Sequence, residues 1–500
     1  MFERSIAATL LATAAAMLPL RLQAQGVVIS GASSAQYVEL RPLVLDSVLY
    51  DSTTAGWSYY RLTPTGIPST CQGTNAYCTF FRSSNQQSLT AMMQDLDVTA
   101  WGLGQGISAH AELRARTATG TASDLWPQAT QHFDALAAYV DIDRAFGRAR
   151  LGRQWIRSTL GVFNFDGGMV SLHPLSWLSG EVYGGGALVE GLNRPLSADE
   201  LTPVEDVPPA DHAYLVGTQL EFRPSSTGAI TAQYQRELRR DRNGLYSERF
   251  AATGEFRVGI TTLSGVLSRD LATSVNNEMS ATLRVPILRT LDGTFTLRHY
   301  APYFDLWTIW GAFSPVGYDE FTSHMRWASP EGRVTLGGDA GWRNYDDTQT
   351  GVASLPLRTN GWRLGGTGSV RVTNALSLAG DYNRDIGPGA SSSSGDLSLQ
   401  WITSDALHFA LNSTAFQNVG EYAIGDGTVY GMGGETGIRL TPEVQLVGDV
   451  FFYRHLSHDK PNTVNWNQRR ASLRLEWTLG SQPTWGGAIG KARGSAGSVP

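Results

Sequence analysis

Side chains capable of nucleophilic chemistry are scattered through the sequence without a recognisable motif. His324 follows Ser323, and His455 and His458 lie near Asp459, but nine histidines in 500 residues make such neighbours ordinary. Many serine hydrolases carry G-x-S-x-G, and many zinc proteases carry H-E-x-x-H. Neither motif occurs here, and no P-loop occurs either. We therefore predict no catalytic residues and no enzyme.

Possible ligands for metals or cofactors are equally unpatterned. Asp346, Asp347 and Asp426 fall in expected loops but lack the spacing of an EF-hand. The glycine-rich stretch Gly102–Gly106 lies between two strand-like segments and does not precede a helix, so it is a turn and not a nucleotide-binding loop. We expect no metal and no cofactor.

A third group of side chains consists of acids and arginines on adjacent strand-like segments, many of them two positions apart. These residues are Asp95, Asp97, Glu112, Arg114, Arg116, Asp134, Arg148, Arg150 and Arg153. On extended strands, residues two apart lie on one face. If that face lines a water-filled lumen, opposing rows of charge would influence which ions pass. The alternative is that the same side chains form ion pairs that only brace the wall.

The segments that carry these residues have the period of β-strands. Between residues 107 and 115 the odd positions are Ile, Ala, Ala, Leu and Ala, and the even positions are polar or charged. Residues 278–285 and 470–477 repeat this alternation. A helix would require apolar spacings of three and four. Each segment is therefore predicted to be a strand with one apolar and one polar face.

The connections between these strands alternate in length. The short ones are Gly102–Gly106, Pro224–Gly228, Ser329–Gly332, Thr373–Asn374, Ser404–Asp405 and Thr441–Glu443. The long ones are Asp51–Asn85, Thr117–Gln131, Glu190–Asp211, Tyr303–Tyr318, Tyr345–Leu357 and His455–Thr463. Short turns at one end and long loops at the other are typical of transmembrane up-and-down barrels.

This alternation predicts an all-β, antiparallel transmembrane barrel of about 22 strands, between Ala35 and Gly480. Merging the hairpin around residues 164–188 would reduce the number to 20. The turns would be periplasmic and the long loops extracellular. Tryptophans near strand ends are candidates for interfacial girdles, namely Trp101, Trp155, Trp327, Trp342, Trp401, Trp466 and Trp477. A soluble sandwich is the alternative, but it would have to bury its mixed small and aromatic faces in one core.

The two ends of the chain differ from the middle. Residues 1–24 contain a basic Arg4 and a short apolar stretch, as in a signal peptide. Residues 25–480 would form the barrel, and the Gly/Ser-rich residues 481–500 a disordered periplasmic tail. After export, Cys71 and Cys78 are expected to form a disulfide that closes a short loop. A formal net charge of −6 and a pI of about 5.9 argue against nucleic-acid binding.

The whole pattern resembles Gram-negative outer-membrane β-barrels of the porin-like kind. A local arrangement, Gly152-Arg153-Gln154, then Phe165–Gly168, then Val182–Gly185, is similar to one in uncharacterised barrels of this kind. The resemblance implies location in the bacterial outer membrane and contact with lipid and lipopolysaccharide. The sequence departs from the pattern in its tail, because such barrels commonly end on an aromatic strand, here the one carrying Trp477.

Three functions are compatible with such a barrel. The first is a porin-like channel for passive or substrate-biased diffusion of small hydrophilic solutes. The others are a non-conducting scaffold or adhesin and an outer-membrane hydrolase. TonB-dependent transporters have as many strands but carry a plug before the first one, and the strand-like segment Tyr37–Leu45 begins too early to leave room for a plug.

Two loops are candidates for narrowing the channel, Asp51–Asn85 and Glu190–Asp211, although an external position is equally compatible with their composition. The basic residues Arg236, Arg239, Arg240 and Arg242 lie near an expected extracellular strand end, where they could contact lipopolysaccharide phosphates. Neither the transported solute nor the oligomeric state follows from the sequence.

Overall fold

The computed structural model describes most of the segment between Gly26 and Gly480. The described residues are 26–41, 43–55, 60–62, 68–71, 76–121, 123, 132–188, 213–239, 245–301, 317–346, 359–387, 390–420, 427–457 and 465–480. The predicted signal peptide, the predicted tail and the loop Glu190–Asp211 lie outside these residues. Among them, no helix is both long and apolar enough to cross a membrane.

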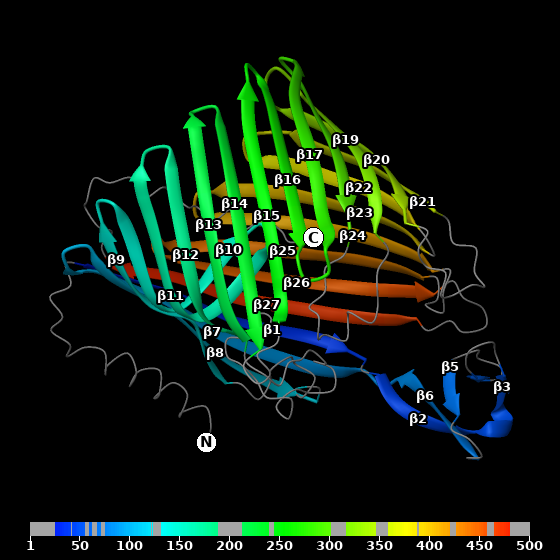
Figure 1. The fold of residues 1–500 in the computed structure, drawn as a ribbon. Coiled ribbons are helices and arrows are strands. Elements are labelled where there is room, and N and C mark those ends of the chain that lie inside the picture. The colour runs from blue at the N-terminus through cyan, green and yellow to red at the C-terminus, as the bar shows by residue number, and fades with distance from the viewer. Residues whose placement is uncertain are drawn as a thin grey trace, which may run out of the picture.

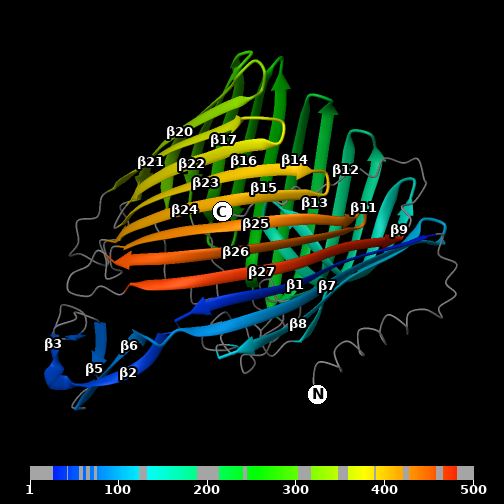
Figure 2. The ribbon, with the colours of Figure 1, turned by 180° about the vertical axis from the view of Figure 1, so that it is seen from behind.

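Twenty-two strands form one closed antiparallel sheet, in which β1 pairs with both β7 and β27 (Figures 1 and 2). The strands are β1 (Gly26–Leu40), β7 (Gln87–Gly104), β8 (Ile107–Gly120), β9 (Phe133–Arg144), β10 (Gly147–Ser158), β11 (Gly161–Leu175), β12 (Leu178–Ala187), β13 (Ala213–Ser225), β14 (Gly228–Arg239), β15 (Leu245–Val258), β16 (Thr261–Asp270), β17 (Val275–Leu288), β18 (Leu291–Tyr300), β19 (Tyr318–Ala328), β20 (Val334–Tyr345), β21 (Asn360–Arg371), β22 (Leu376–Gly387), β23 (Ala390–Ser404), β24 (Leu407–Gly420), β25 (Gly427–Thr441), β26 (Val444–Ser457) and β27 (Trp466–Gly480). The predicted barrel and its strand number are confirmed.

The first strand is not where the sequence pattern placed it. We expected it at Tyr37–Leu45, but β1 runs from Gly26 to Leu40, and the chain then leaves the barrel. The small residues in GASSAQ weaken the alternation of hydrophobicity, although they pair fully with β7 and β27. The first barrel strand begins at Gly26 and the last one ends at Gly480. Both positions lie on the side of the barrel that carries the short turns.

The two faces of the wall differ as predicted. Aliphatic side chains alternate with the polar ones and are more than half exposed, as at Leu220, Leu297, Leu336, Leu397 and Leu473. Exposed aliphatic residues spread over a closed barrel form a surface suited to lipid. We call this the outer face, and the face of opposite parity the inner face.

The tryptophans are divided between these faces. By strand parity, Trp327, Trp342, Trp401 and Trp477 lie on the outer face near strand ends. Trp101 and Trp466 lie on the inner face, so the expected girdle does not include them. Trp466 instead stacks on His455, with ring centroids 5.2 Å apart.

The connection between β1 and β7 is a separate sheet of five short strands. These are β2 (Leu43–Leu49), β3 (Thr53–Ala55), β4 (Tyr60–Leu62), β5 (Pro68–Cys71) and β6 (Tyr77–Ser83), and they lie beyond the long-loop end of the barrel (Figures 1 and 2). A disulfide joins Cys71 to Cys78, which lie opposite each other on β5 and β6. The described part of this connection is an external sheet, not a constriction.

Candidate functional site

The charged residues singled out in the sequence lie almost entirely on the inner face. Asp95, Asp97, Glu112, Arg114, Arg116, Asp134, Arg148 and Arg150 share the inner parity of β7–β10. Arg153 has the opposite parity, because Gly152 and not Arg153 lies across from the inner Tyr139. The structure therefore separates Arg153 from the other eight residues.

Acids and arginines on neighbouring strands pair with each other. Arg114 Nε and Nη2 donate to the two carboxylate oxygens of Asp95 at 2.7 and 3.2 Å. Arg150 binds Asp141 in the same bidentate way, at 2.8 and 3.1 Å. Arg116 donates to Asp134, whose side chain is nearly inaccessible to solvent. Because these charges neutralise each other across strands, they brace the wall more than they create a transverse field.

The strand pair β10–β11 leaves this wall partway along its length. Pairing of β10 with β9 ends at Arg153, and pairing of β11 with β12 begins at Phe165. The pairing between β10 and β11 nevertheless continues to Ser158 and Gly161. Residues 154–164, which we call the infolded hairpin, therefore have ladder partners only on β10 and β11.

The infolded hairpin lies over the inner face of the neighbouring wall and contacts β14 and β15. The backbone N–H of Thr159 donates to Gln233 Oε1 at 2.9 Å, and the guanidinium of Arg249 lies 5.3 Å from the centre of the Phe163 ring. Gln233 and Arg249 both belong to the inner face. In both views the hairpin lies between opposite walls of the barrel (Figures 1 and 2). It is therefore inside the lumen.

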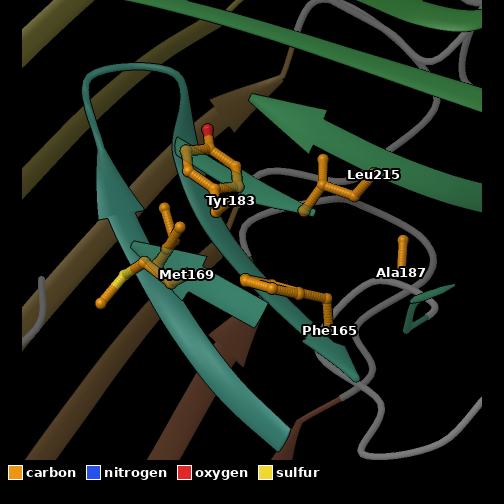
Figure 3. Close-up of a cluster of buried hydrophobic side chains, with 6 residues drawn as sticks. Phe165, Met169, Tyr183, Ala187 and Leu215 are labelled. Carbon is orange, nitrogen blue, oxygen red and sulfur yellow. The ribbon is translucent and has the colours of Figure 1, made fainter. Parts of the chain in front are cut away.

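A small apolar core holds the hairpin to β11, β12 and β13 (Figure 3). It comprises Ile156, Phe165, Met169, Tyr183, Ala187 and Leu215, with Phe163 packed against it. Phe165 is completely buried, and its ring centre lies 5.9 Å from that of Tyr183. Full burial of such side chains stabilises a structure by about 1.5–3 kcal/mol each. The hairpin is therefore a packed element of the interior.

Glycines make the bend possible. Gly152, Gly167 and Gly185 lie side by side on the inner face of β10, β11 and β12. A Cβ on Gly167 would lie 2.1 Å from the oxygen of Gly184, and one on Gly152 would lie 2.2 Å from the oxygen of Ala138. Gly152 also has a φ of 129°, a region that favours glycine. The three glycines thus form a row without side chains where the sheet turns inward.

The polarity of the hairpin agrees with a position in water. On the short-turn side of the bend, the outer face of β10 and β11 carries exposed Leu151 and Val170. On the other side of the bend, the same parity carries the ion-paired Arg153 and Asp166 and the exposed Arg157, together with Trp155, Val162 and the buried Asn164. Charged groups facing lipid are costly. The appearance of Arg153, Arg157 and Asp166 on the outer parity is the sequence signal that we missed, because the candidates for constriction were sought only in long loops.

The inner wall also contains carboxylates that are not paired with arginine. On β22 and β23, Asp381 lies directly opposite Asp396, beside a cavity of 290 Å³ lined by Thr335, Thr367 and Ser369. Among the described residues, neither acid is within ion-pair distance of an arginine; Asp381 accepts a hydrogen bond from Asn383 at 3.1 Å. No described cluster of three or more His, Cys, Asp or Glu side chains could hold a metal.

A closed barrel with an apolar outer face and a polar interior defines a transmembrane β-barrel of the bacterial outer membrane. No protein-family model and no curated protein matches the sequence.

Several solved structures have a similar fold. OccAB4 of Acinetobacter baumannii is 8% identical, with a TM-score of 0.37, covering 92% of this chain and all of that one. A mutant of the ferric enterobactin receptor PfeA from Pseudomonas aeruginosa is 9% identical, with a TM-score of 0.48, covering 90% and 80%. A BenF-like porin from Pseudomonas fluorescens Pf-5 is 9% identical, with a TM-score of 0.37, covering 90% and 99%. At these identities the similarity concerns the barrel fold alone.

Proposed function

We propose that the protein is a porin-like channel that lets small hydrophilic solutes diffuse across the outer membrane. The observation that carries this proposal is the polar inner face of a closed barrel of 22 strands. A barrel of this size encloses a lumen too wide to be filled by wall side chains alone. The infolded hairpin narrows this lumen.

In the described part of the barrel, the unpaired carboxylates of the inner face favour cations, whereas exposed inner arginines near the short turns, such as Arg257, Arg284 and Arg326, oppose this preference. The arginines of β8 and β10 are neutralised by acids, as at Arg150–Asp141, whereas Asp381 and Asp396 are not paired with arginine among the described residues. Carboxylates lining an aqueous pore attract cations and repel anions. Asp95, Asp97, Glu112, Arg114, Arg116, Asp134, Arg148 and Arg150 remain proposed pore-lining residues with a secondary effect on selectivity.

The outer face supports contact with lipopolysaccharide. Its charged groups in the described strands are confined to the long-loop ends, apart from Arg144 at a turn, the Arg153–Asp166 pair at the bend and the infolded hairpin. The arginines at those ends are Arg236, Arg269, Arg384, Arg454 and Arg469. Guanidinium groups at this level are suited to lipid phosphates. Of the basic cluster considered from the sequence, Arg240 and Arg242 lie outside the described residues.

A scaffold or adhesin is the second candidate, and the external sheet favours it. Leu45, Leu49 and Tyr77 share one face of β2 and β6 and are each more than half exposed. A hydrolase has less support. His299 Nδ1 lies 2.7 Å from Asp319 Oδ1 near the long-loop end, but within the described part of the chain no serine hydroxyl is hydrogen-bonded to this histidine.

Single-channel recording of the refolded full chain in planar bilayers tests the proposal. We expect stable, ohmic openings and a reversal potential displaced towards cations in a salt gradient. The absence of conductance in a preparation that shows heat-modifiable migration, and is therefore folded, would favour the scaffold. Amino-terminal sequencing of the exported protein would test cleavage after residue 24.

A further inference from the structure

We infer that the infolded hairpin is a gate that alternates between the docked position described above and an undocked position in which the lumen is wider. This inference rests on the proposed channel function and concerns its regulation. Four observations support it: few backbone bonds to the wall, the glycine row, unsatisfied polar groups in the docked state, and a polar surface beneath the hairpin.

The first observation is that undocking breaks no strand ladder. Between residues 154 and 164 the ladder bonds join β10 only to β11, so they move with the hairpin. The described polar contacts to the rest of the barrel are few: Thr159 N–H to Gln233, Asn164 Nδ2 to the oxygen of Leu136 at 3.0 Å, and Leu188 N–H to the oxygen of Asn164 at 2.9 Å. An element held by so few bonds opens before the sheet around it does.

The second observation is that the glycine row lies where the hairpin leaves the wall, so it can act as a hinge. Gly152, Gly167 and Gly185 cross three adjacent strands where pairing with β9 and β12 ends. Any side chain at these positions would collide with a backbone oxygen of the neighbouring strand, so the absence of side chains permits the backbone to bend there. Hinges are a few residues that absorb a change in backbone angles while the elements on either side stay rigid.

The third observation is that docking leaves buried polar atoms without partners. Gln154 is fully buried and Asn164 is 3% exposed, yet within the described part of the chain Gln154 Oε1 and Asn164 Oδ1 accept no hydrogen bond. Such atoms lose hydration without compensation, which opposes the apolar contacts of Ile156, Phe163 and Phe165. Opposing contributions of this kind keep two positions close in free energy.

The fourth observation is the surface that undocking would uncover. Gln233, Gln235 and Glu237 lie on the inner face of β14 and are each less than a tenth exposed. Gln235 is linked to Tyr183, whose hydroxyl donates to Gln235 Oε1 at 3.1 Å. Amide and carboxylate groups are compatible with water once the hairpin has moved, so the undocked lumen would still be polar.

Thiol labelling of the full-length protein provides the test. The two native cysteines are joined in a disulfide, so a cysteine at Gln233→Cys would be the one free thiol. We expect slow labelling by a membrane-impermeant maleimide, because the docked Thr159 covers this position. Adding Phe163→Ala removes apolar contact from the docked state and should raise the labelling rate about tenfold. The matched control is Val162→Ala, since Val162 is 58% exposed on the opposite face and should change the rate less than about twofold.

Conductance measurements distinguish an incorrect gate proposal from an incorrect channel proposal. Phe163→Ala should increase the time spent at a larger conductance level, and Val162→Ala should not. Unchanged labelling and unchanged conductance in Phe163→Ala would overturn the gate while leaving a conducting channel. Accelerated labelling without conductance in any variant would overturn the channel proposal but retain a mobile hairpin.

A cross-link gives a second measurement. The double variant Thr159→Cys with Gln233→Cys should form a disulfide across the docking contact under oxidising conditions. We expect the oxidised protein to remain at the small conductance level and reduction to restore the larger one. A cross-linked protein with the full range of wild-type conductance levels would contradict the gate.

Discussion

Arg153 and Asp166 form a bidentate ion pair at the point where the hairpin leaves the wall. Arg153 Nε lies 2.7 Å from Asp166 Oδ1 and Nη2 lies 2.8 Å from Oδ2, while Nη1 donates to the oxygen of Ala135 on β9 at 3.1 Å. Both side chains occupy the parity that faces lipid elsewhere in the barrel. The pair therefore links the base of the infolded hairpin to the last paired part of the wall.

Replacing this arginine should loosen the hairpin. Arg153→Gln removes the bidentate pair, but half of the Asp166 side chain is exposed, so the loss should be about 1 kcal/mol or less. In the Gln233→Cys background we expect labelling to accelerate up to about fivefold. Arg157→Gln changes the same charge four residues away, at an exposed position, and is the control. Equal rates in the two variants would mean that the pair does not restrain the hairpin.

A side chain added within the glycine row should lower the stability of the barrel. A Cβ on Gly185 would lie 2.2 Å from the oxygen of Asp166, whereas a Cβ on the neighbouring Gly186 would meet no atom within 4 Å. Gly185→Ala should therefore lower the free energy of unfolding by about 1–3 kcal/mol through overpacking, and Gly186→Ala should have little effect. The measurement is the temperature at which the heat-modifiable folded band disappears. If both variants lose it at the same temperature, the close contact does not exist.

Ion preference should depend on the acids of β22 and β23. The double variant Asp381→Asn with Asp396→Asn removes two opposed carboxylates without changing side-chain size, and should lower the cation-to-anion permeability ratio about twofold. Reversal potentials in a salt gradient measure this ratio. Asp46→Asn also removes a carboxylate, but in the external sheet, and should leave the ratio unchanged. A ratio unaffected by the double variant would remove these residues from the conduction path.

The disulfide should stabilise the external sheet and not the barrel. Cys71→Ser with Cys78→Ser removes the only covalent cross-link of β5 to β6, so the segment between β1 and β7 should become more sensitive to protease. The barrel strands share no cross-link with this sheet, and heat-modifiable migration should be unchanged. Loss of the folded band in this variant would show that the barrel depends on the disulfide.

The external sheet should also respond to acid. The Arg82 guanidinium, followed by the backbone N–H of Ser47, holds the pKa of Asp46 below its ordinary value of 3.8. A lowered folded-state pKa contributes stability above the ordinary value, and this stability is lost as the pH falls through the folded-state pKa. Protease sensitivity of β2 and β6 should therefore rise below about pH 4. Asp46→Asn should abolish this pH dependence, and the same rise in the variant would assign it to another group.

The sequence alone determined the architecture, because strand alternation and turn position are local properties. The period of two in residues 107–115 and the short turn at Thr441–Glu443 both depend on neighbours a few residues apart, and both appear in the structure as predicted. The inner parity of residues such as Arg114 and Arg150 follows from the same alternation. The start of β1 was missed because small residues give the alternation too little contrast.

Only the tertiary structure decided what occupies the lumen. Thr159 and Gln233 are 74 residues apart, and their contact depends on the closure of the barrel, the bend at three glycines on different strands, and an apolar core shared by β10–β13. Each glycine is ordinary in its own strand, and the row exists only after Gly152, Gly167 and Gly185 are placed in register. Local periodicity specifies which face a side chain occupies, whereas the departure of a hairpin from the wall depends on long-range contacts that periodicity does not encode.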